Sequence, residues 1–535
     1  MPDRETLEVD VLFVGAGPAS LAGAYHLARL ARDRGAGRTE PSIAVLEKGS
    51  AVGLLSFSGG VMDPRALREL IPDFEARGAP LGERVTEDRV MLLTPRQAVP
   101  FPVTPPAFRN HGNYVVSLSQ LTPWLAQQAE ALGVQIFSGF SGTDLLYDAE
   151  RVLGVRTGDK GIDKHGNPKP NHEPGIDIRS KVTVLGEGPR GSLTKQHVRR
   201  LRLDEGRSPE AYATGVKEVW RIPEGAFGAG RVVHTLGYPS DLSSRAGIAG
   251  GWLYGLSPTH LSIGYVVWLN YRDPFLNPHA DFQRFKTHPW VAALLEGGEI
   301  VEYGAKAVPE GGWHTIPRLV SDGCCLVGDA AQMVNGQRLK GIHLAMKSGM
   351  LAAEAILPCL ESGDVSANAL EAYPRAFQRS WAGRELYRTR NFHGAFEGGF
   401  WSGAVRSEIQ RLLGGADPFG SPAFEADPDA LMTASAFHGE GARGPSPPHA
   451  DGRRTFSKVD SVFRSGTRHE EDQPAHLLVA DWDLCRSRCA AEFGNPCVRF
   501  CPANVYEMEP ESGGARLQLN PSNCVHCKTC DIKDP

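Results

Sequence analysis

The chain has 535 residues, of which 41% are hydrophobic, 22% charged and 8% aromatic, and its formal net charge is −5. This length exceeds what one hydrophobic core supports and predicts two to four domains. The slightly acidic balance argues against a nucleic-acid partner, and no apolar run approaches the roughly 20 residues that a membrane-spanning helix needs. The first strand begins almost at once, which leaves no room for a signal or transit peptide and predicts a cytoplasmic protein of a prokaryote.

The first unit is a strand, a glycine-rich loop and an amphipathic helix in "VLFVGAGPASLAGAYHLARL" (11–30). Gly15 permits a tight turn, and Gly17 lets a pyrophosphate approach the amides at the start of the helix. A second strand in "SIAVLEKG" (42–49) ends at Glu47, whose carboxylate can accept hydrogen bonds from a ribose. The long spacing between the glycine loop and Glu47 is interpreted as a loop insertion at 31–41. The predicted dinucleotide site comprises Gly15, Gly17, Pro18, Ala19, Ser20, Glu47 and Lys48.

A second G-x-G-x-x-G pattern, Gly186 to Gly191, lies in "KVTVLGEGPRGSL" (181–193). The segment after it is basic, and no strand ending in an acid follows at the spacing that a ribose contact needs. A strand that returns to the sheet of the first nucleotide site is therefore favoured over a separate NAD site.

The stretch "CCLVGDAAQMVNGQRLKGIHLAMKSGMLAAEAI" (324–356) favours FAD as the dinucleotide. A buried strand leads to Gly328 and Asp329, whose carboxylate can bind a ribityl hydroxyl, although Asp329 could also cap a helix. Gly341 is predicted to open a helix that directs its positive end at the flavin ring. Ser58, in "LSFSGGVMDP" (55–64), is a candidate hydrogen-bond partner of that ring.

Seven of the ten cysteines lie between Cys485 and Cys530, a crowding that indicates metal or cluster ligation in a reducing compartment. Cys524, Cys527 and Cys530, in "CVHCKTC", can supply three ligands of a cubane iron–sulfur cluster. The fourth ligand must come from elsewhere in the chain. Cys324, Cys325 and Cys359 are interpreted as core residues.

The sequence resembles the electron-transfer flavoprotein:ubiquinone oxidoreductases along nearly its whole length. The segments that carry the resemblance are "GAPLGERVTEDRV" (78–90), "HGNYVVSLSQLTPWLAQQAEALGV" (111–134), "GIDKHGNPKPN" (161–171), "YGAKAVPEGGW" (303–313), "AMKSGMLAAEAI" (345–356), "HEEDQPAHL" (469–477), "RFCPANVYE" (499–507) and "NCVHCKTCDIKDP" (523–535). The resemblance implies electron-transferring-flavoprotein dehydrogenase activity with FAD, one [4Fe–4S] cluster, and ubiquinone or menaquinone as acceptor. It also implies electron-transfer flavoprotein as a partner and peripheral attachment at the cytoplasmic face of the inner membrane.

The fourth cluster ligand is predicted at Cys501. In two-cluster ferredoxins, the cysteine of a Cys-Pro pair serves the cluster held by the other run of cysteines. Cys501-Pro502 is such a pair, and it completes the set with Cys524, Cys527 and Cys530, in agreement with the family's ligand pattern. Zinc is the alternative, but the C-x2-C-x2-C spacing suits a cubane better than paired zinc knuckles.

Cys485, Cys489 and Cys497 depart from the mitochondrial pattern of this family. They could hold a second cluster, whose fourth ligand position falls on Asp534. Because carboxylate is a poor partner for such clusters, a relic with free or zinc-bound thiols is favoured.

The resemblance places a quinone near Gly250 and Gly251, where missing side chains could leave backbone groups open to quinone carbonyls. A bulge in a strand is the alternative interpretation. "AVPFPVTPPAF" (98–108) and "NFHGAFEGGFWSGAV" (391–405) are the expected membrane contacts, with ordinary surface loops as the alternative.

The expected fold is α/β and multidomain: a Rossmann-like FAD-binding domain interleaved with a quinone-binding sheet domain, followed by a ferredoxin-like module. The FAD-binding domain is expected at 1–70, 115–200 and 318–370, and the quinone- and membrane-facing domain at 71–114 and 201–317. Residues 371–455 are expected to form a helical segment and linker, and 456–535 the iron–sulfur domain. The competing function is an NAD(P)H-dependent reductase or hydroxylase of the geranylgeranyl-reductase class, which would not need the four cysteines.

Overall fold

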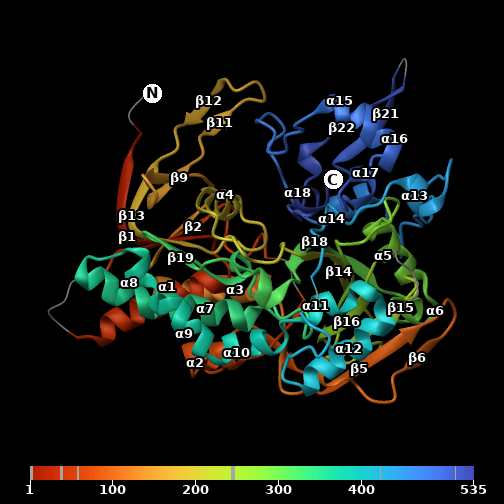
Figure 1. Cartoon of the computed structure of the whole chain (residues 1–535), viewed down its shortest axis with the longest axis horizontal. Helices are drawn as coiled ribbons and strands as arrows, with labels where there is room; N and C mark the ends of the chain where they lie inside the picture. The colour runs from red at the N-terminus through yellow and green to blue at the C-terminus, as the bar shows by residue number, and fades with distance from the viewer. Residues whose placement is uncertain are drawn as a thin grey trace.

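The computed structural model describes residues 4–35, 40–56, 59–242, 247–421, 423–511 and 514–534 (Figure 1). One domain is built on an eight-stranded sheet, in which β1 runs parallel to β13 on one side and to β2 on the other. The path of this sheet is β19 (Val320–Ser321), β20 (Cys324–Leu326), β13 (Asp177–Leu185), β1 (Thr6–Val14), β2 (Ile43–Glu47) and β8 (Gln135–Ser138). In addition, β10 (Arg151–Thr157) pairs with β13, and β9 (Gly142–Asp148) pairs with β10.

Apolar side chains explain why these strands lie in the middle of the domain. The second half of β1 and most of β2 are buried, as expected of parallel strands that are covered by helices. The long helices α1 (Pro18–Asp33) and α7 (Ile342–Ser362) pack against each other, and α3 (Leu118–Glu130) packs against α1. Around them lie α2 (Arg65–Leu70), α4 (Ser192–Leu201), α8 (Ala367–Leu370), α9 (Ala372–Arg379), α10 (Trp381–Arg388) and the hairpin β11 (Lys160–Ile162)–β12 (Pro168–Glu173).

A second, seven-stranded sheet lies beside the first domain, at the lower right of Figure 1. Its order is β18 (Glu299–Pro309), β14 (Tyr212–Arg221), β17 (His260–Trp268), β16 (Ala249–Ser257), β15 (Arg231–Gly237), β5 (Glu87–Leu93) and β6 (Ala98–Pro100). Helix α5 (Pro278–Thr287) packs on β14 and β17, and α6 (Pro289–Leu294) follows it. A small sheet of β3 (Gly60–Met62), β7 (Tyr114–Val116) and β4 (Leu81–Arg84) contacts β16 through its last two strands.

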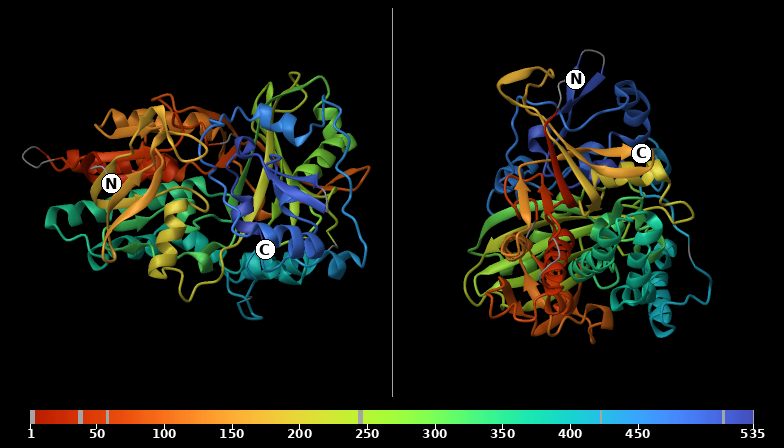
Figure 2. Two further views of the ribbon diagram at one scale, coloured as in Figure 1. Left: turned by 90° about the horizontal axis from the view of Figure 1, so that it is seen from above. Right: turned by 90° about the vertical axis from the view of Figure 1, so that its left-hand side faces the viewer.

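The C-terminal module lies above the seven-stranded sheet in Figure 1, and both views of Figure 2 keep the two in contact. It contains the hairpin β21 (Tyr506–Glu511)–β22 (Gly514–Leu519) and short helical segments. These are α14 (Lys458–Arg464), α15 (Trp482–Leu484), the π-helix η5 (Cys485–Cys489), α16 (Ala490–Phe493), α17 (Cys497–Phe500) and α18 (Thr529–Lys533). The segment before it carries α11 (Phe392–Ala395), η4 (Phe396–Gly398), α12 (Phe400–Leu412) and α13 (Ala434–His438). Single 3-10 turns lie at η1 (Pro106–Phe108), η2 (Gly312–Thr315), η3 (Gly328–Ala331) and η6 (Pro521–Asn523).

The edge strand β18 positions the C-terminal module, which contains the predicted cluster cysteines. On one side β18 pairs with β14, and on the other the Ala307 N–H donates to the Cys527 carbonyl at 2.8 Å. The Tyr303 hydroxyl, also on β18, donates to the Pro502 carbonyl at 2.8 Å. The module thus covers an edge that would otherwise present unpaired backbone groups.

Several predictions about the fold are confirmed. The strand before Gly186 is β13, which lies between β1 and β20, so the second glycine motif returns to the first sheet. Gly341 is the N-cap residue of α7, as expected. The insertion predicted at 31–41 is in part helical, because α1 continues to Asp33. Among the helices that the structure describes, none is both long and apolar enough to cross a membrane.

Candidate flavin and iron–sulfur sites

The first glycine loop has the shape that an anion site needs. Gly15 adopts a φ of +89°, and a Cβ there would lie 2.8 Å from the Gly186 carbonyl oxygen, so the two glycine motifs meet backbone to backbone. Gly17 is the N-cap of α1 and Pro18 opens it, and no side chain among the described residues caps this end. The first amides of α1 are therefore free to receive a phosphate group.

Ala19 and Ser20 lie in the first turn of α1, where both are buried. The Ser20 hydroxyl has no hydrogen-bond partner among the described residues, and a Cβ on Gly186 would lie 2.3 Å from it. Ser20 thus packs closely against the second glycine motif. An uncapped helix end beside an unpartnered buried hydroxyl fits the phosphate end of a dinucleotide.

Glu47, at the end of β2, is oriented by its own loop. Its Oε2 accepts from the Ala16 N–H at 3.0 Å, and its Oε1 accepts from the Gly49 N–H at 2.7 Å. Each carboxylate oxygen keeps a further lone pair. Glu47 therefore ties β2 to the glycine loop and can still accept a ribose hydroxyl, so the arrangement fits the predicted role.

Asp329 lies in η3, directly after the strand that the sequence predicted. The N-cap of η3 is Val327 and that of α7 is Gly341, so Asp329 caps neither element and the alternative interpretation as a cap is wrong. A Cβ on Gly341 would lie 3.5 Å from the Asp329 Oδ1. Asp329, Gly328 and Gly341 thus meet beside the start of α7, whereas Ser58 lies outside the described residues.

Lys306 of β18 connects this region with the cluster loop, and sequence reasoning assigned it no role. Its Nζ donates to the His526 carbonyl at 3.4 Å. Burial, and then repulsion from Lys48 and Lys528, lower the pKa of Lys306 to about 8. Burial raises the pKa of Asp329 to about 6, and the charge of Lys306 opposes that shift. The sequence offered one signal for Lys306, its place in the segment 303–313 that carries the family resemblance.

The four predicted cluster cysteines come together from two segments. Cys501 ends α17, while Cys524, Cys527 and Cys530 lie in the loop that leads into α18. All four line one cavity, together with Leu477, Ala503, Val505, Tyr506, Val525 and Lys528. The Cys524 sulfur accepts from the His526 N–H at 3.4 Å, which is a contact typical of cluster thiolates.

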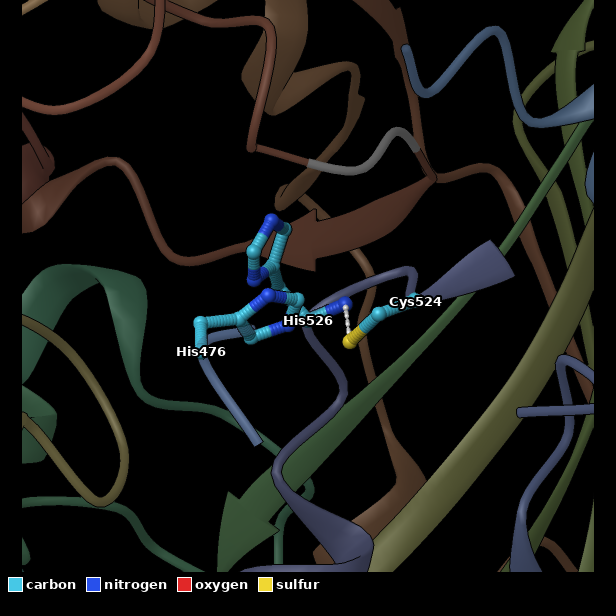
Figure 3. Close-up of side chains that lie close together, drawn as sticks. All are labelled: His476, Cys524 and His526. Atoms are coloured by element: carbon cyan, nitrogen blue, oxygen red, sulfur yellow. Dashed lines mark hydrogen bonds between the residues drawn. The ribbon is translucent and has the colours of Figure 1, made fainter. Parts of the chain in front are cut away.

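The spread of these sulfurs separates a cluster from a single ion. A zinc ion holds its thiolates at about 2.3 Å, which brings ligand atoms within roughly 4.6 Å of one another. Among the described residues, only His476, Cys524 and His526 have ligand atoms gathered nearly this closely, within 4.8 Å of one another (Figure 3). The four cysteines are not gathered so closely, so their arrangement does not match a single zinc ion.

The imidazoles of His469, His476 and His526 form a group beside Cys524, with ring centroids 5.0–5.5 Å apart. His469 Nε2 lies 2.7 Å from the Cys524 carbonyl oxygen, to which it can donate. Burial, followed by the nearby charge of Lys48, lowers the pKa of His526 to about 2, so this ring is neutral at pH 7. Lys48 of the nucleotide loop therefore lies close to the cluster loop. His526 lies far along the chain from His469 and His476, so the sequence alone did not show that the three form a group.

The structure corrects the expectation for Gly250 and Gly251. Both lie within β16, which pairs with β15 on one edge and β17 on the other at these positions, so their backbone does not stand open. The bulge alternative is wrong as well, since the register shift in β16 falls between Gly255 and Ser257. A Cβ on Gly251 would lie 2.5 Å from the Phe285 ring, so close packing explains this glycine.

Comparison with known proteins agrees with this geometry. The family model described as "ETF-QO, ubiquinone-binding" matches residues 212–308, and the one described as "Electron transfer flavoprotein-ubiquinone oxidoreductase, 4Fe-4S" matches residues 452–535. The electron transfer flavoprotein-ubiquinone oxidoreductase of Pseudomonas aeruginosa is 42% identical over 541 residues, covering 100% of this chain and 96% of that protein. The mitochondrial one of Oryza sativa subsp. japonica is 41% identical over 541 residues, covering 99% of this chain and 90% of that protein.

Two solved structures share the fold. A geranylgeranyl bacteriochlorophyll reductase-like protein from Thermoplasma acidophilum has a TM-score of 0.57 at 16% identity, covering 81% of this chain and 98% of that one. The flavin-dependent brominase Bmp2 has a TM-score of 0.50 at 19% identity, covering 78% of this chain and 96% of that one. At such identities these likenesses concern the fold alone, and the reductase alternative is not favoured. The near full-length relatives decide the assignment: the chain belongs to the electron transfer flavoprotein-ubiquinone oxidoreductase family.

Proposed function

We propose that this chain receives electrons from reduced electron-transfer flavoprotein at its four-cysteine module and delivers them to a quinone at a membrane surface. One observation carries the proposal: the glycine-motif domain and the cluster loop are in contact. Lys195 of α4, which follows the second glycine motif, pairs with Asp531 beside Cys530 at 2.6 Å, and the Lys306 Nζ donates to the His526 carbonyl at 3.4 Å. Two redox sites that lie next to each other can exchange electrons within one molecule.

Separate parts of the chain would hold the two cofactors. The uncapped start of α1 and Glu47 would bind the pyrophosphate and ribose of FAD, and Asp329 with the start of α7 would face its ribityl chain and ring. Cys501, Cys524, Cys527 and Cys530 would hold the [4Fe–4S] cluster. When bound, the cluster supplies one-electron transfer, and the flavin supplies the change from one-electron to two-electron chemistry. Lys306, whose Nζ donates to the His526 carbonyl, would favour negative charge on a cluster held by the neighbouring cysteines.

The quinone would lie within residues 212–308, the region that the ubiquinone-binding model matches. Gly250 and Gly251 belong to this region, but both are buried and paired and Phe285 packs against Gly251, so they would shape the site rather than bond to the quinone. A photoreactive quinone should label residues 212–308. Labelling confined to the eight-stranded sheet would contradict this position.

Membrane contact would involve two segments at the lower end of the molecule in Figure 1 and in the right-hand view of Figure 2. Val99 and Val103 near β6 are exposed, as are Trp401 and Val405 of α12. The first part of the predicted second segment does not take part, because Phe392 and Phe396 pack against Trp268. Exposed apolar side chains on short elements can enter the headgroup boundary without spanning it.

The function is tested by following anaerobic electron transfer from reduced electron-transfer flavoprotein to a soluble quinone. The wild-type protein should reduce the quinone. Cys527→Ser should lose the cluster and this activity but keep FAD, whereas Cys359→Ser, which alters a cysteine buried in the first core, should behave like the wild type. Full activity of Cys527→Ser without its cluster would contradict the proposed path.

A further inference from the structure

Three cysteines outside the four-cysteine set gather at one place in the C-terminal module. Cys485 and Cys489 lie at the two ends of the π-helix η5, a rare element that is frequent at functional sites. The chain then reverses at Gly494 and Asn495, which have φ values of +64° and +53°, and returns to Cys497 at the start of α17. The Asn495 side chain donates to the Cys485 carbonyl at 2.9 Å, which holds the turn against the π-helix.

The three cysteines belong to one packed region of the module. Cys485 packs against the small buried core that contains Cys497 and Cys501. The Asn495 N–H donates to the Cys489 carbonyl at 3.4 Å, so the turn before Cys497 is bonded to both ends of the π-helix.

Asp534 ends the run that begins at Cys524 in the same way as Cys501 ends the run that begins at Cys485. Cys501 follows Cys497 with three residues between and precedes Pro502, and Asp534 follows Cys530 with three between and precedes Pro535. Their φ and ψ values agree, at −68° and 120° for Cys501 and −65° and 123° for Asp534.

The hydrogen bonds of the two positions agree as well. The Cys501 N–H donates to the Cys497 carbonyl at 3.2 Å, and the Asp534 N–H donates to the Cys530 carbonyl at 3.4 Å. The short helices α17 and α18 that carry these pairs contact each other. The module therefore contains two related halves.

In two-cluster ferredoxins, the last ligand of each run serves the cluster held by the other run. Cys501 meets this rule, because it lines the cavity of Cys524, Cys527 and Cys530. Asp534 holds the equivalent position in the other run: it follows α18, which contacts α17, the helix that begins at Cys497.

We propose that Cys485, Cys489 and Cys497 hold a second iron–sulfur cluster, with Asp534 at its fourth ligand position. A single zinc ion is disfavoured, because among the described residues these four are not gathered within single-ion distance. A carboxylate is a weaker ligand for such iron than a thiolate, so the iron next to Asp534 is the exchangeable one. Loss of that iron leaves [3Fe–4S]. One electron reduces [3Fe–4S]⁺ to [3Fe–4S]⁰, and binding of one Fe²⁺ then gives [4Fe–4S]²⁺ with the Asp534 carboxylate on the added iron.

The first test is the iron and acid-labile sulfide content of the anaerobically purified holoprotein. Two clusters predict about seven or eight irons per chain, whereas the four-cysteine site alone predicts about four. After brief oxidation, electron paramagnetic resonance should show the signal of an oxidised three-iron cluster, and dithionite with Fe²⁺ should remove it. About four irons, with or without an added zinc, would overturn the proposal.

Variants then assign the site. Cys489→Ser should lose three to four irons, as about half of the total, and keep FAD and quinone reduction by the remaining centres. The matched control Cys359→Ser should lose none. Asp534→Cys should remove the three-iron signal without lowering the iron content, because it supplies the missing thiolate. If Cys489→Ser does not fold, the Asp534→Cys spectrum decides: an unchanged three-iron signal would overturn the assignment of Asp534.

Discussion

At the scale of single residues, Glu47 is the acid on which nucleotide binding is expected to depend most. Its two hydrogen bonds to the Ala16 and Gly49 amides fix the carboxylate before any ligand binds. Glu47→Gln keeps the shape but removes the charge, and a charge-assisted hydrogen bond contributes about 1.5–3 kcal/mol. We expect FAD affinity to fall roughly tenfold to a hundredfold, measured by flavin retention and titration of the apoprotein. Unchanged retention would argue against a ribose contact.

Lys306 is expected to set a redox potential rather than to bind a substrate. A charge about 10 Å from a redox centre contributes about 1–2 kcal/mol at an effective dielectric constant near 20. Lys306→Met should therefore make the cluster harder to reduce, seen as a more negative midpoint potential in a spectroscopic titration. Lys181→Met is the control, because Lys181 pairs with Asp10 on the surface of the first domain. Equal potentials in wild type and Lys306→Met would contradict this role.

At the scale of elements, β14 and α5 are joined by a buried ion pair. The Lys286 Nζ lies 2.8 and 2.9 Å from the two Glu218 oxygens, and both side chains are fully buried. Glu218→Gln leaves the ammonium uncompensated and should lower the free energy of unfolding by about 3–5 kcal/mol. Denaturant unfolding of this variant should be compared with Glu299→Gln, which breaks an exposed pair with Arg221 and should cost less than about 1 kcal/mol. Similar losses in the two variants would contradict the prediction.

Helix α12 is the element that we expect to reach the membrane. Trp401 and Val405 lie one turn apart and are 59% and 64% exposed. Each apolar side chain that leaves water contributes about 1.5–3 kcal/mol, so replacing both by Ser should weaken binding to anionic vesicles more than tenfold in a flotation assay. Leu478→Ser removes an exposed apolar side chain from the cluster module and should have no effect. Equal weakening by both changes would place the contact elsewhere.

Local patterns made the strand–loop–helix units predictable, whereas long-range pairing did not follow from them. The Gly15 loop, Glu47 and the start of α7 at Gly341 occur where the sequence placed them, because each depends on neighbouring residues. The pairing of Gly250 and Gly251 depends on two other strands, and Lys306 gains its surroundings only when β18 meets the cluster loop. The domain boundaries and the roles of the site residues stay predictions.

At the scale of the whole molecule, the two glycine motifs determine which electron donors can act. In the part of the chain that the structure describes, no side chain caps the start of α1, so its amides are open to a phosphate. At the start of α4, by contrast, Glu187 accepts from the Leu193 N–H at 3.2 Å and the Thr194 N–H at 2.7 Å. A carboxylate that already occupies these amides repels a second pyrophosphate, so the Gly186–Gly191 motif cannot serve NAD(P)H as the first motif serves FAD.

We therefore expect neither NADH nor NADPH to reduce the flavin at a useful rate, whereas reduced electron-transfer flavoprotein should do so. A hydride donor delivers an electron pair and gains nothing from a one-electron cluster, but a donor of single electrons does gain from it. Anaerobic stopped-flow mixing with each of the three donors, followed at the flavin absorbance, makes the comparison. Rapid bleaching by the protein donor should be lost in Cys527→Ser, while the response to nicotinamides stays absent in both proteins. Bleaching by either nicotinamide within seconds, with no response to the protein donor, would show that α4 binds a second dinucleotide despite its carboxylate cap and would assign the chain a hydride donor instead.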